Sequence, residues 1–380
     1  MTENRKTPKL RFKGFTDAWE QRKLGEFTIS YSGGTPSVGI KEYYNGQIPF
    51  IRSAEINSEI TELFLTEEGL KNSSARLVDV GDILYALYGA TSGEVGRARL
   101  KGAVNQAILV IKPHKEYDSE FLTNWLRKSK ESIVETYLQG GQGNLSGTIV
   151  KELLVCSPSH REQEEIGSFF YNLDNLITLH QRKLDRLKNI KKSMLDKMFP
   201  KDGEVVPEIR FKGFTDAWEQ RKLGEVLRTI PFKPFLKIPE QGGKYEIIQQ
   251  GNEPIIGYAN GEPCEDFRNT VIFGDHTLSL YKPKQSFFVA TDGVRILQGT
   301  NDMDGYYLLS LLEGNSPQSE GYKRYYSILA DREVLFTENH YEQVKIGLYF
   351  KNLNNLITLH QRKLDKLKNI KKSMLDNMFV

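Results

Sequence analysis

Side chains able to read the edges of nucleotide bases gather in two stretches of this chain, residues 27–161 and 226–341. Arginine and lysine can bind guanine O6 and N7, asparagine and glutamine can bind adenine N6 and N7, and cations also meet phosphates. The candidates in the first stretch are Arg52, Arg97, Arg99, Asn105, Gln106, Gln142 and Asn144. Those in the second stretch are Gln249, Gln250, His276, Lys282, Lys284, Arg295, Lys323 and Arg324. These side chains have the chemistry that could read bases, and the alternative for each residue is an ordinary surface or strand-edge position.

Catalytic motifs do not occur in the sequence. The segment GATSGEVG, residues 89–96, lacks the GK[ST] ending that places a lysine on phosphates. The six histidines form no H-E-x-x-H motif, and Cys156 and Cys264 form neither a C-x-x-C pair nor a zinc-spaced cluster with histidine. No G-x-S-x-G elbow and no N-P-P-Y motif of adenine methylases is present. We therefore expect a binding and scaffolding protein with no catalytic residue, no metal site and no cofactor of its own.

Length, charge and hydropathy limit the number of domains, the partners and the location that we expect. A chain of 380 residues exceeds the size at which single cores stop growing, about 250 to 300 residues, so two or more domains are expected. Its 52 basic and 49 acidic residues leave a net charge of +3, which is too small by itself to indicate a polyanionic partner. No apolar run is long enough for a membrane span, and the first residues lack the apolar core of an export signal. We expect no membrane contact and a cytoplasmic location.

Two internal repeats frame the candidate stretches. Residues 8–26 return as residues 207–225 with 17 of 19 positions identical, and residues 166–199 return as residues 346–379 with 28 of 34 identical. The stretches that the repeats enclose show no obvious similarity to each other. Repeats must be identified first, because they decide the architecture. Identical frames around unlike inserts predict two copies of one partner docked on a pseudo-two-fold scaffold and two different targets being read.

The second repeat reads as a long helix in each copy. Ser159 with Glu162, and Asn339 with Glu342, have capping-box spacing and predict helix starts near residues 160 and 340. The first helix should end at Phe199, before a linker over residues 200–206. About 39 helical residues span about 58 Å, more than one turn of B-DNA at about 34 Å. Such a helix pair can act as a spacer.

Apolar residues in both helices follow alternating steps of four and three, which is a heptad seam. The seam consists of Leu173, Ile177, Leu184, Leu187, Met194 and Met198 in the first helix and Leu353, Ile357, Leu364, Leu367, Met374 and Met378 in the second. His180 and His360 fill polar seam positions and should help to set the register. An antiparallel coiled-coil spacer is the favoured interpretation, and simple core packing is the alternative.

The inserts mix short strands, glycine turns and one modest helix each, which predicts an α+β module in each case. The helices are expected over residues 118–138 and near residues 306–312.

The whole chain resembles the specificity subunit of Type I restriction-modification systems. The resemblance rests on RFKGFTDAWEQRKLGE opening each half, on SGGTPS and IPFIRSAEI, and on GNLSGTIVKELLVCSPSHREQEEIG leading into the first helix. In the second insert it rests on GDHT and FFVATDGVRIL. The second helix entry departs slightly, because Glu338 stands where the first copy has Pro158 and Tyr341 where it has Arg161.

The resemblance implies two α/β target recognition domains, residues 1–160 and 207–340, separated by a central conserved helix, residues 161–199, and a distal one, residues 341–380. It implies recognition of a bipartite asymmetric DNA site, each half read by one domain across a gap that the helices set. Its partners would be two modification subunits, which use S-adenosylmethionine to methylate adenine at N6, and restriction subunits, which use ATP and Mg to translocate and cleave DNA. This chain would be a non-catalytic subunit.

Two other functions remain open from the sequence. A self-sufficient methylase or nuclease would modify or cut DNA without partners. A coiled-coil adaptor would bind only protein, and its weak affinity for DNA would fall with salt and show no sequence preference.

Overall fold

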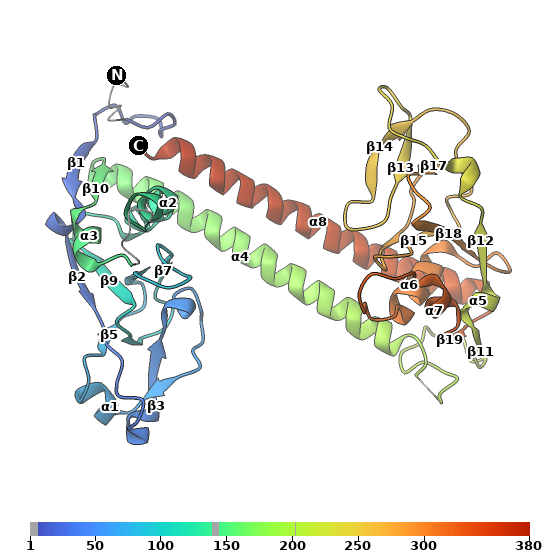
Figure 1. The fold of residues 1–380 in the computed structure, drawn as a ribbon, viewed down its shortest axis with the longest axis horizontal. Helices are drawn as coiled ribbons and strands as arrows, with labels where there is room; N and C mark the ends of the chain where they lie inside the picture. Colours follow the sequence, from blue (N-terminus) through green and yellow to red (C-terminus); the bar gives the residue numbers. More distant parts are fainter. Residues whose placement is uncertain (1–6, 139–143, 202) are drawn as a thin grey trace. The chain divides into compact units, whose positions relative to one another are not determined.

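The computed structural model describes residues 7–138, 144–201 and 203–380 and divides into two compact units (Figure 1). Unit 1 comprises residues 1–179 and 364–380, and unit 2 comprises residues 180–363. Two long helices, α4 (His160–Lys197) and α8 (His340–Met378), each contribute one part to each unit. The unit boundaries thus fall inside the two helices.

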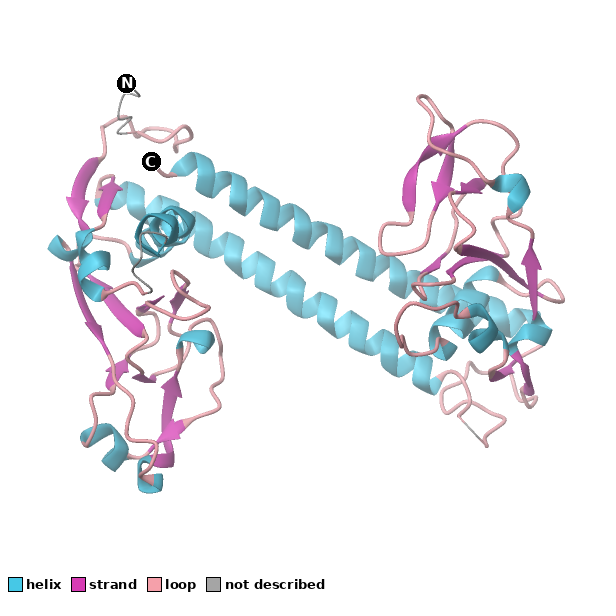
Figure 2. Ribbon diagram, in the orientation of Figure 1, coloured by secondary structure: helices cyan, strands magenta, loops and turns pink. Residues whose placement is uncertain are grey.

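Both units combine sheets with helices, as Figure 2 shows. The expected α+β class with two long helices is confirmed.

Unit 1 contains two four-stranded sheets and a two-stranded one. The strand orders are β2-β9-β6-β7, β4-β3-β8-β5 and β1-β10, and β3 and β8 are parallel. The strands are β1 (Glu20–Lys23), β2 (Thr28–Ser32), β3 (Tyr44–Ile51), β4 (Phe64–Leu65), β5 (Arg76–Val78), β6 (Ile83–Ala86), β7 (Val95–Arg97), β8 (Gly102–Val104), β9 (Ile108–Pro113) and β10 (Leu154–Ser157). The shorter helices are α1 (Glu67–Lys71), α2 (Ser119–Leu138) and α3 (Gly147–Glu152). Helix α2 matches its predicted range to within one residue, because its apolar side is buried in the largest core of this unit.

Unit 2 repeats the strand order of unit 1 sheet by sheet, except that β5 has no counterpart. Its sheets run β12-β18-β15-β16, β14-β13-β17 and β11-β19. The strands are β11 (Glu219–Lys222), β12 (Leu227–Ile230), β13 (Tyr245–Ile248), β14 (Ile255–Ala259), β15 (Thr270–Gly274), β16 (Leu280–Tyr281), β17 (Phe287–Val289), β18 (Val294–Gly299) and β19 (Glu333–Phe336). The helices are α5 (Leu223–Val226), α6 (Gly305–Asn315) and α7 (Tyr326–Ala330). The predicted short helix is α6, which is longer than expected.

Helices α4 and α8 run antiparallel within each unit. In unit 1 the rings of Phe170 and Phe379 lie 5.7 Å apart, and Lys371 contacts Asp174. In unit 2 the rings of Phe199 and Phe350 lie 6.3 Å apart, and residues 180 and 360 face each other. The predicted starts near residues 160 and 340 are confirmed, and α4 ends at Lys197, two residues before the predicted end.

The two carboxylates expected in capping boxes have another role. Glu162 accepts two hydrogen bonds from the guanidinium of Arg11, at 2.5 and 2.7 Å, and Glu342 accepts two from Arg210, at 2.7 and 2.9 Å. Both carboxylates are buried. A bidentate arginine is a stronger partner than a single backbone N–H, so each carboxylate holds the first repeat against a helix start.

The repeats also meet at the helix ends. The backbone N–H of Leu10 donates to the carbonyl of Asn377 at 2.8 Å in unit 1, and that of Ile209 donates to Lys197 at 2.9 Å in unit 2. Trp19 and Trp218, at equivalent repeat positions, are buried in the respective cores. We call each set of packed repeat segments a frame.

Among the residues that the structure describes, every helix is too short or too polar to cross a membrane.

Candidate nucleic-acid interface

A buried carboxylate in unit 2 gathers several of the predicted base-reading residues. Asp275 follows β15 directly and is fully buried. Its Oδ2 accepts from Nε of Arg295 at 3.2 Å and from Nη1 of Arg324 at 3.4 Å, and its Oδ1 accepts from the backbone N–H of Tyr326 at 2.9 Å. A buried carboxylate must be paired and hydrogen-bonded, so Asp275 fixes the positions of both guanidinium groups.

Arg324 keeps much of its surface free for a ligand. Its side chain is 50% exposed, and its second amino group contacts Asp292 at 3.1 Å. The hydrogen bond to Asp292, followed by the charge of Asp275, raises the pKa of Arg324 above its already high usual value. A guanidinium has five donors, so these contacts leave N–H groups for a phosphate or a base edge.

An aromatic stack borders these cations. The ring of His276 lies on the ring of Tyr322 at 4.6 Å and 6° between planes, and Tyr322 is 87% exposed. The backbone N–H of His276 donates to the side-chain oxygen of Gln250 at 3.1 Å, and its Nδ1 lies 3.1 Å from the carbonyl oxygen of Lys323. The structure thus places five predicted residues together with Asp275 and Tyr322. We call this the Asp275 cluster: Gln250, Asp275, His276, Arg295, Tyr322, Lys323 and Arg324.

Three predicted residues of the second insert lie outside this cluster. The side chain of Gln249 donates to the carbonyl of Glu253 at 2.9 Å. Lys284 is exposed in the turn after β16. Lys282 is buried and donates to the carbonyl of Phe267 at 2.5 Å, and desolvation lowers its pKa to about 8. Its ammonium therefore faces the protein interior and not a ligand.

The three predicted arginines of the first insert are each matched by carboxylates. Arg52 contacts Glu55 at 2.8 Å and Glu62 at 2.6 Å, and these hydrogen bonds raise its pKa. Arg99 contacts Glu59 at 2.8 Å in an exposed pair, and Arg97 contacts Glu120 of α2 at 2.9 Å. Arg97 and Glu120 are both mostly buried, so their contact joins β7 to α2, while exposed pairs such as that of Arg99 are weak and can exchange for phosphates.

The predicted amides of the first insert that the structure describes, Asn105, Gln106 and Asn144, lie outside helices and strands. Gln106 is exposed and accepts a hydrogen bond from the hydroxyl of Thr35 at 2.5 Å, and Asn105 accepts from the backbone N–H of Ala107 at 3.2 Å. Asn144 is exposed, and Gln142 lies outside the described residues.

The predicted seam residues are all buried or half-buried in the structure. Leu173, Leu184, Met198, Leu353, Leu364 and Met378 are buried, and Ile177, Leu187, Met194, Ile357, Leu367 and Met374 are half-buried. The Nδ1 atoms of His180 and His360 lie 3.0 Å apart at the middle of this seam.

Leucines at another face of the helices remain exposed at repeated positions. Leu176 and Leu179 of α4 are 47% and 61% exposed, and Leu356 and Leu359 of α8 are both 46% exposed. Each pair occupies the same place in its frame, since the offset is 180 residues. The chain therefore presents one apolar feature twice.

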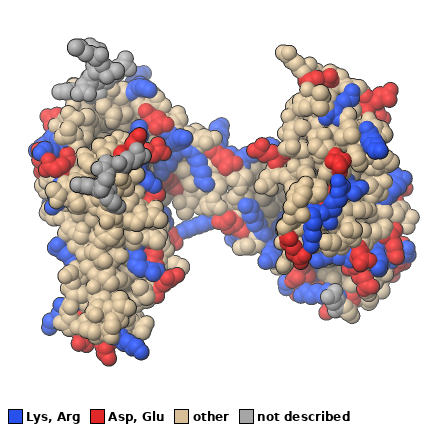
Figure 3. All heavy atoms as spheres, in the orientation of Figure 1, with Lys and Arg blue, Asp and Glu red and all other residues tan. Residues whose placement is uncertain are grey.

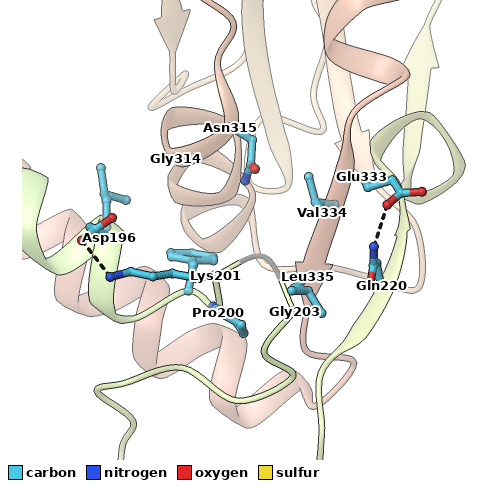
Figure 4. A pocket seen from close by; sticks show the side chains of 12 residues that line it. Asp196, Pro200, Lys201, Gly203, Gln220, Gly314, Asn315, Glu333, Val334 and Leu335 are labelled. Atoms are coloured by element: carbon cyan, nitrogen blue, oxygen red, sulfur yellow. Dashed lines mark hydrogen bonds and ion pairs between the residues drawn. The ribbon is translucent and has the colours of Figure 1, made fainter.

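We find no metal-binding cluster in the described part of the chain. No group of three or more histidine, cysteine, aspartate or glutamate side chains lies close enough to hold a metal ion there. A hollow of about 430 Å³ in unit 2 lies beside the linker, and in it Gln220 and Glu333 already pair at 2.6 Å (Figure 4). Basic and acidic side chains are interspersed on the visible face of each unit in Figure 3, in agreement with the small net charge.

Sequence reasoning missed two members of the Asp275 cluster. Asp275 itself carries no base-reading chemistry, and it matters because it orients the arginines. Tyr322 stands directly before Lys323 and Arg324, and an exposed aromatic residue among cations is a known signal for nucleic-acid contact that could have found it.

The chain is similar to proteins of one kind over most of its length. Residues 16–189 match the family model for the Type I restriction modification DNA specificity domain. The specificity subunit of the Type I restriction enzyme MjaIX from Methanocaldococcus jannaschii is 26% identical over 288 residues, which cover 71% of this chain and 65% of that protein. The MjaVIII specificity subunit of the same organism is 24% identical over 70% of this chain and 64% of its own length. The chain thus spans slightly less than two thirds of these relatives.

One solved structure shares the fold. The crystal structure of a Type I restriction-modification S subunit from M. genitalium matches with a TM-score of 0.74 at 16% identity, over 98% of this chain and 99% of that one. Together these similarities confirm the resemblance inferred from the sequence.

Proposed function

This chain carries a Type I restriction modification DNA specificity domain over residues 16–189, and from that premise we propose that it recognises DNA sequence for a Type I restriction-modification complex. It reads a bipartite asymmetric site, one half with each insert, and α4 and α8 set the length of the gap. The chain itself is non-catalytic.

The observation that carries this proposal is the duplication of one frame around two unlike inserts. Each frame holds its helix start with the same arginine–glutamate pair, Arg11 with Glu162 and Arg210 with Glu342. The inserts share a strand order, apart from the additional β5 of the first, and they differ in sequence and in the residues they expose. Two equivalent frames that carry two inserts of different sequence suit a DNA site whose halves differ in sequence.

The Asp275 cluster supports a reading role for the second insert. It offers an exposed aromatic ring, an amide and cations side by side, which are the groups that contact base edges and phosphates. In the first insert the equivalent candidates are the exposed amides Gln106 and Asn144 and the paired arginines Arg52 and Arg99.

The repeated exposed leucines support docking of two identical partners. Leu176 with Leu179, and Leu356 with Leu359, give each frame the same apolar surface. We assign these surfaces to two modification subunits, which bind S-adenosylmethionine and methylate adenine at N6 after taking the base out of the duplex. Restriction subunits, dependent on ATP and Mg, join the same complex.

Exchange of one insert tests the proposal. The chain is expressed with its modification subunits, and the methylated adenines of the host genome are mapped before and after residues 27–161 are replaced by the insert of another specificity subunit. We expect one half of the methylated sequence to change while the other half and the gap stay the same. A change in both halves would refute modular reading. Affinity for all duplexes without sequence preference would favour the adaptor, and methylation or cleavage by the purified chain alone would favour a self-sufficient enzyme.

A further inference from the structure

The two inserts dock on their frames through equivalent helices, α2 and α6. The backbone N–H of Asp118, just before α2, donates to the side chain of Gln163 at 3.0 Å, and that of Asp304, just before α6, donates to Gln343 at 3.2 Å. Gln163 and Gln343 are equivalent repeat positions. Asp118 of the first insert therefore corresponds to Asp304 of the second, although the inserts share no obvious sequence.

The frame glycines confirm this alignment. A Cβ atom at Gly167 would lie 2.1 Å from Oδ1 of Asp118, and one at Gly347 would lie 2.3 Å from Oδ1 of Asp304. Since both glycines occupy the same repeat position, both docking helices approach their frames equally closely. Residues counted from Asp118 and Asp304 can therefore be paired along the two helices.

Nine residues beyond these aspartates the two helices carry opposite charges. Arg127 occupies the position in α2 that Glu313 occupies in α6. On the frame side, Asp174 of α4 is replaced by Asn354 of α8, one of only six differences among the 34 positions of the helix repeat. The frame lysine at this place, Lys371 in unit 1 and Lys191 in unit 2, is the same in both copies.

In unit 1 the frame carboxylate lies between two cations. Asp174 accepts from Nη1 of Arg127 at 3.0 Å and from Nζ of Lys371 at 2.5 Å. Lys371 is mostly shielded from solvent, and its pKa is lowered by desolvation first and by the charge of Arg127 next. Without Asp174, Arg127 and Lys371 would repel each other in a half-buried place.

In unit 2 the insert supplies the carboxylate. Nζ of Lys191 donates to Oε1 of Glu313 at 2.7 Å, and both side chains are 20% exposed. An aspartate at position 354 would add a second carboxylate to this place, and the frame has an uncharged amide there.

We propose that this charge pair decides which insert each frame accepts. The frame of unit 1, with Asp174, accepts an insert whose docking helix carries a cation at the position of Arg127. The frame of unit 2, with Asn354, accepts an insert that carries a carboxylate at the position of Glu313. The physical matching stands on the contacts alone, and its meaning as a rule for exchanging DNA-reading modules rests on the proposed function.

The two frames also differ at a second position near their inserts. The frame residue three positions before the Asp174/Asn354 site is Tyr171 in unit 1 and Lys351 in unit 2. Nζ of Lys351 lies 4.6 Å from the ring centroid of Tyr306 in α6, a cation–π contact, and the α2 residue at that position is Glu120. Lys351 thus gives the frame of unit 2 a further contact with its insert.

A double-mutant cycle in unit 1 tests the matching, with thermal unfolding of the full chain followed by calorimetry. Asp174→Asn leaves the two cations opposed, and Arg127→Glu crowds carboxylates around Lys371, so we expect each to lower the midpoint by about 3 °C or more. The double substitution recreates the charges of unit 2 and should return to within about 1 °C of the unchanged chain. If the decrease in midpoint of the double variant equalled the sum of the decreases of the two single variants, the proposal would be overturned.

The reciprocal cycle in unit 2 tests whether the charge matching also holds in the second unit, and so excludes an effect peculiar to the surroundings of Arg127. Glu313→Arg should lower the midpoint, and its combination with Asn354→Asp, which recreates the charges of unit 1, should recover it. Asp185→Asn, at an exposed aspartate of α4, is the matched control and should change the midpoint by less than about 1 °C. A control loss equal to that of Asp174→Asn would also count against the proposal.

A chimera separates this inference from the proposed function. When the second insert replaces the first in the frame of unit 1, Glu313 meets Asp174. Asp174→Asn should then raise the unfolding midpoint of the chimera, although it lowers that of the unchanged chain. If Asp174→Asn changed the unfolding midpoint in the same direction in the chimera and in the unchanged chain, insert matching would be refuted. None of these readouts involves DNA, so absence of sequence-specific DNA binding would contradict the proposed function and leave the cycles unaffected.

Discussion

At the scale of single residues, buried carboxylates decide where the cations of this chain point. Asp275 and Glu162 lie in different units, and each holds arginines that would otherwise take many conformations. The outcome depends on the exposure of the arginine. Arg324 reaches solvent and remains available to a ligand, whereas Arg11 is enclosed and serves only to join two segments.

Arg324 tests the ligand-facing case. Arg324→Ala should weaken binding of the complex to its specific duplex about tenfold or more, because a well-placed arginine contact to a base or phosphate is lost. Affinity is measured by fluorescence anisotropy at fixed salt. Arg221→Ala, at an exposed frame arginine, is the control and should leave affinity unchanged. Equal effects of the two substitutions would mean that the Asp275 cluster does not touch DNA.

Arg11 tests the enclosed case. Arg11→Met leaves the carboxylate of Glu162, which is 1% exposed, buried without its partner, and this should cost about 3–5 kcal/mol of unfolding free energy. Arg210→Met should cost a similar amount, because Glu342 is equally buried. Both are measured by urea unfolding, with the exposed Arg22→Met as control. A frame arginine that behaves like Arg22 would show that the pair does not hold the frame together.

At the scale of elements, periodicity predicted more than capping did. Heptad spacing located the helix seam, and all twelve seam residues are at least half-buried, because burial along an antiparallel pair repeats with that spacing. The capping-box spacing predicted the starts of α4 and α8, but it assigned Glu162 and Glu342 a local partner. Local spacing cannot reveal that an arginine more than 130 residues away competes for the same carboxylate.

The inserts show the same limit. The amphipathic pattern of α2 predicted its range, whereas Lys282 was expected at a ligand and lies under α6 with its ammonium near the ring of Tyr306. The sequence shows that a residue is a lysine, but it does not show how deeply its side chain is buried in the fold. Single members of the Asp275 cluster could be predicted from the sequence, but their grouping could not, because strands from distant parts of the insert bring them together.

The histidine pair predicts a pH dependence at this scale. Desolvation, followed by the charges of Lys183, His180 and Lys363, lowers the pKa of His360, so the folded state favours the neutral ring. The unfolded chain then binds protons more readily, and stability should be full above about pH 6.5 and fall as the pH drops below it.

Calorimetry between pH 7.5 and 5.5 checks this expectation. His360→Gln should reduce the fall in unfolding midpoint over that range, while His160→Gln, at an exposed histidine, should not change it. A fall that is the same in both variants and in the unchanged chain would assign the pH dependence to other groups.

At the scale of the whole molecule, each unit is built from segments that lie far apart in the chain. Phe379, next to the end of the sequence, packs on Phe121 in unit 1, and Phe199 packs on Tyr307 in unit 2. The repeats predicted two equivalent frames, but not that each frame takes its helix segments from both copies. That arrangement follows from antiparallel pairing of the two repeats, because the end of each helix meets the start of the other.

Lengthening both helices together tests the spacer at this scale. Seven residues inserted after His180 and after His360 keep the heptad register, since a heptad restores the seam. They should add about 10 Å to the helix pair, which corresponds to about three base pairs of gap. The methylated sequence of the host genome gives the measurement, and both half-sites should stay the same. Seven residues added instead to the linker after Lys201 should leave the gap as it was, because that segment lies outside both helices. If the linker insertion changed the gap and the helix insertion did not, the helices would not determine the spacing.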